Sequence, residues 1–166
     1  MSINFLSLNV KGLNHPAKRS SLWKTAISHE CDVLCVQETH FAQGATPQCN
    51  NRSFPYVFKA DFSRKQRGVL IAIRDTISFQ LISCTTDPNG RFVILVCKLD
   101  NVLYTIANLY APNHGQLKSH RSVLEKIRKV QEGHLLLCGD FNIVPDVTMD
   151  VSSGPKRISS PLSTFF

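Results

Sequence analysis

The sequence of 166 residues is long enough for one domain of ordinary size, and its 43% hydrophobic residues are enough to bury a core. With 19% charged residues, this composition excludes general disorder. The formal net charge of +7 favours polyanionic partners.

The sequence also bears on membrane targeting and on the state of the cysteines. No apolar run is long enough to span a membrane, and the N-terminus has no basic segment followed by an apolar stretch, so we expect an intracellular protein without a membrane partner. The six cysteines include no CxxC pair. Because Cys35, Cys84, Cys97 and Cys138 lie in or beside apolar β-type runs, we expect reduced, buried thiols.

In chain order, the hydrophobic pattern predicts a strand, a helix that begins at a proline, and a second strand, over residues 3–10, 16–28 and 33–37. The middle of the chain predicts five strands separated by turn residues, at 56–60, 68–74, 79–84, 92–99 and 102–110. A second amphipathic helix is expected over 116–131, followed by an apolar run at 135–138.

Helices and strands in this mixed order indicate an α/β protein whose helices pack outside a sheet or a pair of sheets. The short connections between consecutive strands in the middle of the chain predict antiparallel hairpins.

Polar side chains follow four of the apolar strands. They are Asn9, Glu38, the pair Tyr110 and Asn113, and the pair Asp140 and Asn142. If these strand ends lie side by side, their carboxylate and amide oxygens suit a hard cation such as Mg²⁺, and not zinc. A divalent ion on a basic surface points to phosphate-ester chemistry.

Each of these residues has an ordinary structural explanation when taken singly. Asn9 and Asn142 are typical turn formers, and Tyr110 is typical of a core-lining tyrosine with its hydroxyl at the rim. Glu38 is harder to explain in this way, because an acid directly after an apolar run risks costly burial without a partner.

Four motifs in order match one known family. They read SLNV at 7–10, VQETH at 36–40, NLYAPN at 108–113 and GDFN at 139–142, with the Gly68-Val69 strand between the second and third. This set resembles the endonuclease/exonuclease/phosphatase superfamily, and most closely the apurinic-endonuclease-like domain of LINE retrotransposons. Exonuclease III and the abasic-site endonucleases are relatives of that domain. A lipid or inositol phosphate phosphatase of the same superfamily fits the LNVKGLN and NLYAPN wording less well.

The resemblance implies a four-layer αββα sandwich with a site for Mg²⁺, or alternatively Mn²⁺, at one end of its sheets. By motif position the metal ligands would be Asn9, Glu38, Asp140 and Asn142, with Glu38 the main one. Asp140 would also orient or deprotonate the attacking water, while Asn142 and Tyr110 would hold the scissile phosphate. Tyr110 suits the role of a neutral hydrogen-bond donor, and His40 is expected to support its loop.

The chain departs from the family pattern after GDFN. Family members continue into strands with a second essential aspartate and a Ser-Asp-His motif, whereas here no aspartate follows Asp150 and the last histidine is His134. We therefore expect residues 1–166 to form a partial domain, with its motifs in 3–142 and 143–166 as the start of a C-terminal part whose strands are lacking. A partial sandwich of this kind is expected to leave sheet edges uncovered.

Two basic clusters are candidates for contacts with nucleic acid. Arg64, Lys65 and Arg67 precede the 68–74 strand, and together with Asn113 they are the expected DNA contacts. Lys18, Arg19 and Lys24 form a second cluster on the first helix, which is either a solvated face or a further contact.

The sequence thus predicts a magnesium-dependent DNA phosphodiesterase of the retrotransposon endonuclease type, impaired by the absence of the last motifs. The alternative is a non-catalytic, nucleic-acid-binding remnant of a retroelement. A DNA substrate implies a nuclear location, and the sequence indicates no protein partner.

Overall fold

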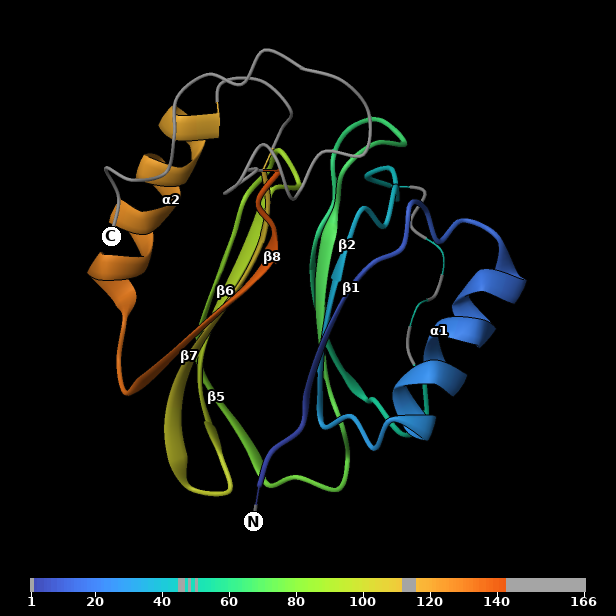
Figure 1. Cartoon of the computed structure of the whole chain (residues 1–166), viewed down its shortest axis with the longest axis horizontal. Helices are drawn as coiled ribbons and strands as arrows, with labels where there is room; N and C mark the ends of the chain where they lie inside the picture. Colours follow the sequence, from blue (N-terminus) through green and yellow to red (C-terminus); the bar gives the residue numbers. More distant parts are fainter. Residues whose placement is uncertain (1, 45–46, 48, 50, 112–115, 143–166) are drawn as a thin grey trace, which may run out of the picture.

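The computed structural model has four layers, with two β-sheets packed face to face and one helix on each outer face (Figure 1). It describes residues 2–44, 47, 49, 51–111 and 116–142, without the side chains of 116–119. Neither helix in these ranges is long and apolar enough to cross a membrane.

The first sheet combines strands from the first half of the chain in the order β1-β2-β4-β3. Its strands are β1 (Phe5–Asn9), β2 (Val33–Gln37), β3 (Tyr56–Ala60) and β4 (Val69–Ile73). β1 and β2 are parallel, and β4 runs antiparallel to both of its neighbours. Helix α1 (Pro16–Ser28) covers the outer face with Leu22, Trp23 and Ala26, and Trp23 stacks on Phe54 with ring centroids 5.4 Å apart.

The second sheet takes its strands in chain order, β5-β6-β7-β8. They are β5 (Phe79–Thr86), β6 (Phe92–Leu99), β7 (Val102–Tyr110) and β8 (His134–Asp140). The first three are antiparallel, and helix α2 (Gln116–Val130) makes the crossover that leaves β7 and β8 parallel. Val123 and Ile127 of α2 pack on the outer face of this sheet.

The layer between the sheets is the main apolar core. β2 and β4 are buried along their whole length, which explains their near-continuous apolar sequences VLCVQ and VLIAI. Residues of β6 such as Val93, Leu95 and Cys97 face them from the second sheet. Opposed apolar faces thus fix how the two sheets dock.

The α/β class, the αββα layering and the position of every expected element are confirmed, with ends shifted by a few residues. One expected pairing is wrong. The short connection after β4 does not form a hairpin, because β4 and β5 belong to different sheets and the chain crosses from one sheet to the other there.

The cysteines are free thiols, as expected. Burial raises the pKa of Cys31, Cys49 and Cys97 to about 11, so these thiols remain protonated and unreactive at neutral pH. The expectation of burial is wrong for Cys84, which is exposed on β5, because β5 is an edge strand with residues 80–84 open to solvent. Cys138, on the other edge strand β8, is only partly buried.

Candidate active site

The polar residues expected at strand ends do gather at one end of the sandwich. β1 is parallel to β2, and β7 is parallel to β8, so within each pair the carboxyl ends lie side by side. Asn9 pairs in register with Gln37, next to Glu38, and Tyr110 pairs with Asp140. The first sheet therefore contributes Asn9 and Glu38, and the second contributes Tyr110 and Asp140.

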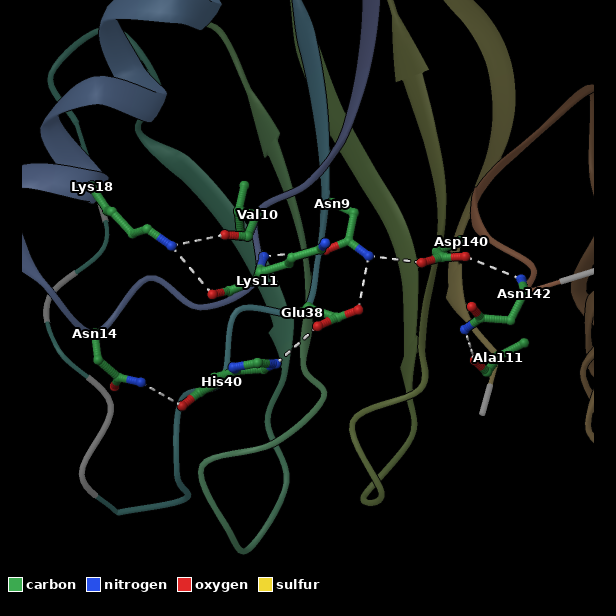
Figure 2. Close-up of polar contacts among 10 residues, drawn as sticks. All are labelled: Asn9, Val10, Lys11, Asn14, Lys18, Glu38, His40, Ala111, Asp140 and Asn142. Atoms are coloured by element: carbon green, nitrogen blue, oxygen red, sulfur yellow. Dashed lines mark hydrogen bonds and ion pairs between the residues drawn. The ribbon is translucent and has the colours of Figure 1, made fainter. Parts of the chain in front are cut away.

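The side chain of Asn9 connects the two sheets (Figure 2). Its Nδ2 donates to Glu38 Oε1 at 2.8 Å and to Asp140 Oδ2 at 2.7 Å. Its Oδ1 accepts from the backbone N–H of Lys11 at 3.1 Å, which fixes the orientation of the amide. Two carboxylates from different sheets thus converge on one amide group.

His40 lies on the far side of Glu38 from Asn9. Its Nε2 is 3.1 Å from Glu38 Oε2, and its carbonyl accepts a hydrogen bond from Asn14 Nδ2 at 2.8 Å (Figure 2). The ring packs against Gly12, where an added Cβ would lie only 3.2 Å from Nδ1. His40 therefore supports the loop through its backbone, as expected, and in addition contacts the carboxylate through its ring.

Asp140 is held from the opposite side by the residues that follow it. Its Oδ1 accepts from the backbone N–H of Asn142 at 3.0 Å, and Asn142 Nδ2 donates to the Ala111 carbonyl at 2.5 Å (Figure 2). The GDFN turn is thus tied to the end of β7, and Asn142 lies next to Asp140.

Tyr110 is partly buried beside these carboxylates. Its pKa is raised above the ordinary value by burial first and then by the negative charges of Glu38 and Asp140, against an opposing effect of Arg67. The phenol is therefore protonated at neutral pH, as a hydrogen-bond donor requires.

An open hollow of about 570 Å³ lies at this end of the sandwich. Asn9, Asp140 and Asn142 line it together with Ser7, Gln37, Gly139 and Phe141. Asn9, Asp140 and Asn142 therefore face a space that a ligand can enter from solvent, and Glu38 adjoins it through its hydrogen bond with Asn9.

Backbone strain is concentrated around the hollow. Eight non-glycine residues have positive φ among the described ones, and five of them belong to the loops at this end: Lys11, Glu38, His40, Arg67 and Asn142. Left-handed backbone costs L-residues free energy and tends to accumulate at functional sites. The strain therefore supports a functional role for these loops.

Comparison with known proteins identifies the family of this site. The family model described as Endonuclease/Exonuclease/phosphatase family matches residues 6–148, which include the described strands apart from Phe5 of β1, and the GDFN segment. The chain belongs to this family.

Similar proteins include one from a transposon. The chain is 25% identical over 165 residues to the transposon TX1 uncharacterized 149 kDa protein of Xenopus laevis. The matched region covers 96% of the chain and 12% of that much longer protein. The fold is similar to an AP endonuclease from Archaeoglobus fulgidus, with TM-score 0.65, 20% identity and coverage of 88% and 60% of the two chains. It is also similar to the endonuclease domain of TRAS1, a telomere-specific non-LTR retrotransposon, with TM-score 0.62, 16% identity and coverage of 85% and 59%.

The chemistry of the site fits a hard divalent cation by ligand type. Two carboxylates converge on the Asn9 amide, while the described residues contain no group of three or more His, Cys, Asp and Glu side chains placed to hold a metal. In one respect the geometry differs from the expected ligand set, because Asn9 presents Nδ2, and not its oxygen, to the carboxylates.

The expected DNA-binding residues are divided by the structure. Arg64 and Lys65 are exposed in the loop before β4, whereas Arg67 is partly buried, lies 4.8 Å over the Phe62 ring and contributes its charge at Tyr110. Asn113 lies outside the described residues.

Two members of the basic cluster on α1, Lys18 and Arg19, have a structural role that the sequence left open. Lys18 Nζ donates to the carbonyls of Val10 and Lys11, both at 3.2 Å (Figure 2). Arg19 donates to the carbonyls of Leu13 and Asn14 at 2.9 and 2.7 Å. These two side chains hold the loop between β1 and α1 beside Asn9.

Sequence reasoning missed two buried amides, Gln37 in the lining of the hollow and Asn108 behind it. Gln37 Nε2 donates to Asn108 Oδ1 at 2.7 Å across the two sheets. The sequence signal was a polar residue inside each of two apolar strands, VLCVQ and VLYTIANLY, at a position that the alternation assigns to the inner face.

Proposed function

We propose that the chain carries the active site of a magnesium-dependent DNA phosphodiesterase, an exonuclease III-like endonuclease of the retrotransposon type. One observation supports this most strongly. Asn9 joins the carboxylates of Glu38 and Asp140 across the two sheets beside the protonated phenol of Tyr110. Two carboxylates, amide groups and a neutral hydrogen-bond donor, gathered at one end of the sandwich next to an open hollow, suit phosphate-ester hydrolysis.

The roles follow from position. Glu38 and Asp140 would hold the cation with Asn9 and Asn142 beside them, and a bound divalent ion would supply stabilisation of the charge on the phosphoryl oxygens. Asp140, fixed by the Asn142 N–H, is also placed to orient a water and accept its proton. Tyr110 would donate to a phosphate oxygen, and Asn142, with Nδ2 on the Ala111 carbonyl, would lie beside that phosphate.

DNA is the proposed substrate because of charge and family. The exposed pair Arg64 and Lys65, with Arg67 at the site and Asn113 in the NLYAPN motif, would contact the phosphate backbone. The formal net charge of +7 and the likeness to a transposon protein support the same substrate, and a nuclear location would follow from it.

We expect this chain by itself to cleave slowly, because its sequence has no Ser-Asp-His motif to assist the described groups. A purely binding role is the alternative. Metal binding and DNA binding are therefore measured separately from cleavage.

The test compares the native chain with Glu38→Gln in two assays. Mn²⁺ binding is followed by electron paramagnetic resonance, and nicking of supercoiled DNA is followed with Mg²⁺ and with EDTA. Because the amide removes a charged ligand, we expect Glu38→Gln to weaken Mn²⁺ binding at least about tenfold and to abolish nicking, as EDTA does.

Glu125→Gln, on the exposed face of α2, is the matched control and should behave as the native chain. Nicking that survives EDTA or Glu38→Gln would contradict the proposed site. DNA binding with no nicking at any Mg²⁺ concentration would favour the non-catalytic alternative.

A further inference from the structure

Two buried side-chain amides join the sheets at the base of the hollow, where Gln37 is one of the lining residues and Asn108 lies behind it. Gln37 is 2% exposed and Asn108 is fully buried, in a layer that is otherwise mostly apolar. Uncompensated amides at such a position would cost substantial free energy, so their hydrogen bonds decide what they do.

The donors of both amides are satisfied. Gln37 Nε2 donates to Asn108 Oδ1 at 2.7 Å and to Ser7 Oγ at 3.0 Å. Asn108 Nδ2 donates to the carbonyls of Val36 at 3.0 Å and Leu70 at 2.8 Å. Asn108 of β7 is thus hydrogen-bonded directly to β2 and β4. Through Gln37 it is also connected to Ser7 of β1.

The position of this pair relative to the site is specific. Gln37 directly precedes Glu38 and pairs in register with Asn9, so it belongs to the first-sheet half of the site. Asn108 lies two residues before Tyr110, which pairs with Asp140, so it belongs to the second-sheet half. The amide contact therefore lies one residue behind Glu38 and two behind Tyr110, between the two halves.

We propose that Gln37 and Asn108 are positioning residues, which set the distance between Glu38 on one sheet and Asp140 on the other. This inference rests on the proposed function, in which the spacing of Glu38 and Asp140 serves to hold a divalent cation. Apolar side chains of similar volume would pack the layer at lower desolvation cost, but they would impose no direction or register. Hydrogen bonds at 2.7–3.0 Å impose both a direction and a register on the two sheets.

The structure contains its own reporter of this distance. Asn9 Nδ2 donates to both Glu38 and Asp140, so its two amide protons are held only while the carboxylates keep their spacing. In ¹⁵N-labelled protein these protons are identified by their loss in Asn9→Asp, and their exchange with solvent is measured by NMR.

The main variant is Gln37→Met, which keeps the side-chain length and removes the donor to Asn108. We expect faster exchange of the Asn9 amide protons and Mn²⁺ binding weakened by about 10- to 100-fold, the range typical of residues that orient metal ligands. The double variant with Gln37→Asn and Asn108→Gln keeps two amides of the same summed length, and it should recover both properties in part.

Thr105→Val separates positioning from stability. Thr105 is a fully buried polar residue of the same strand β7 as Asn108. Its hydroxyl donates to the Glu132 carbonyl at 2.7 Å and accepts from the Glu132 backbone N–H at 2.9 Å, away from the site. We expect this variant to lower the melting temperature while exchange of the Asn9 protons and Mn²⁺ affinity stay native. Native values of both in Gln37→Met, or an equal change in Thr105→Val, would overturn the inference.

Failure of the proposed function gives a different result. If the native chain binds no Mn²⁺ and nicks no DNA, the proposed function is wrong, but exchange of the Asn9 amide protons still shows whether the pair sets the spacing of the two carboxylates.

Discussion

Close approaches of backbone at individual glycines shape the loops of the site. At Gly12 the ring of His40 packs over the backbone, and at Gly68, with φ +93°, the side chain of Thr39 fills the space that a Cβ would need. Thr39 and His40 follow Glu38 directly, so both glycines act on the loop that carries this carboxylate. The LNVKGLN, QETH and Gly68-Val69 segments are therefore physically dependent on one another.

We expect Gly68→Ala to destabilise the fold by about 2–5 kcal/mol. Left-handed backbone costs an L-residue about 1–2 kcal/mol, and overpacking against Thr39 adds about 1–3 kcal/mol. Gly44→Ala is the control, because Gly44 also has positive φ but open space around it, and it should cost about 1–2 kcal/mol. Urea unfolding measures the loss in the free energy of unfolding of both variants. Equal losses would show that the contact with Thr39 is unimportant.

Whether a site residue could be predicted from the sequence depended on its position relative to the apolar strands. Glu38 directly follows the apolar strand β2, where a charge has few structural explanations, whereas Asp140 at the end of β8 was identified through the GDFN motif. The orientation of the Asn9 amide was not predictable, since it depends on the Lys11 N–H and on Asp140, which lies 131 positions away in sequence. Asn108 was missed because its partners lie on strands that sequence alone does not place opposite each other.

At the scale of elements, two basic pairs have different roles, one at the start of helix α1 and one in the loop before β4. Lys18 and Arg19 donate to four backbone carbonyls between β1 and α1, whereas Arg64 and Lys65 are exposed before β4. Only the second pair is free to exchange its counterions for phosphates without disturbing a loop.

We therefore expect the double variant Arg64→Ala with Lys65→Ala to reduce the salt dependence of DNA binding. Each lost phosphate contact should lower the slope of log K against log salt by about 0.9. Lys18→Ala should leave this slope unchanged and lower the melting temperature instead. Fluorescence anisotropy of labelled duplex DNA at several salt concentrations provides the slope. An unchanged slope in the double variant would remove this loop from the interface.

The elements themselves were predictable because apolar periodicity reflects burial directly. α1 (Pro16–Ser28) begins at the proline that the sequence indicated, and β2 and β4 are buried on both faces, as their uninterrupted apolar runs suggest. Sheet membership was not predictable, since the connections after β3 and β4 are both short and only the first joins partners.

At the scale of the whole molecule, the part of the sandwich formed by residues 2–44, 51–111 and 116–142 has end strands that no further strand pairs with. β1 and β8 are end strands of their sheets among the described residues, and they lie beside each other. Leu135 and Leu137 of β8 are 42% and 38% exposed, and the strand carries no lysine to discourage pairing with another chain.

We expect this chain to self-associate as its concentration rises, through the edge formed by β8. Replacing Leu135 and Leu137 by lysine should shift it toward monomer, because charge on an edge strand opposes strand addition. Leu124→Lys, at a similarly exposed position on α2, should have little effect. Sedimentation velocity over a range of concentrations distinguishes these outcomes, and a native chain that is monomeric throughout would contradict the prediction.

The bridge from Glu38 through Asn9 to Asp140 also links binding to folding. Asn9 and Asp140 belong to adjacent edge strands of different sheets, so a ligand held between the two carboxylates must also hold the sheets together. A ligand that binds only the folded state at 100 times its dissociation constant stabilises it by about 2.7 kcal/mol. Occupancy of the hollow is therefore readable as resistance to heat, even for a ligand that is never turned over.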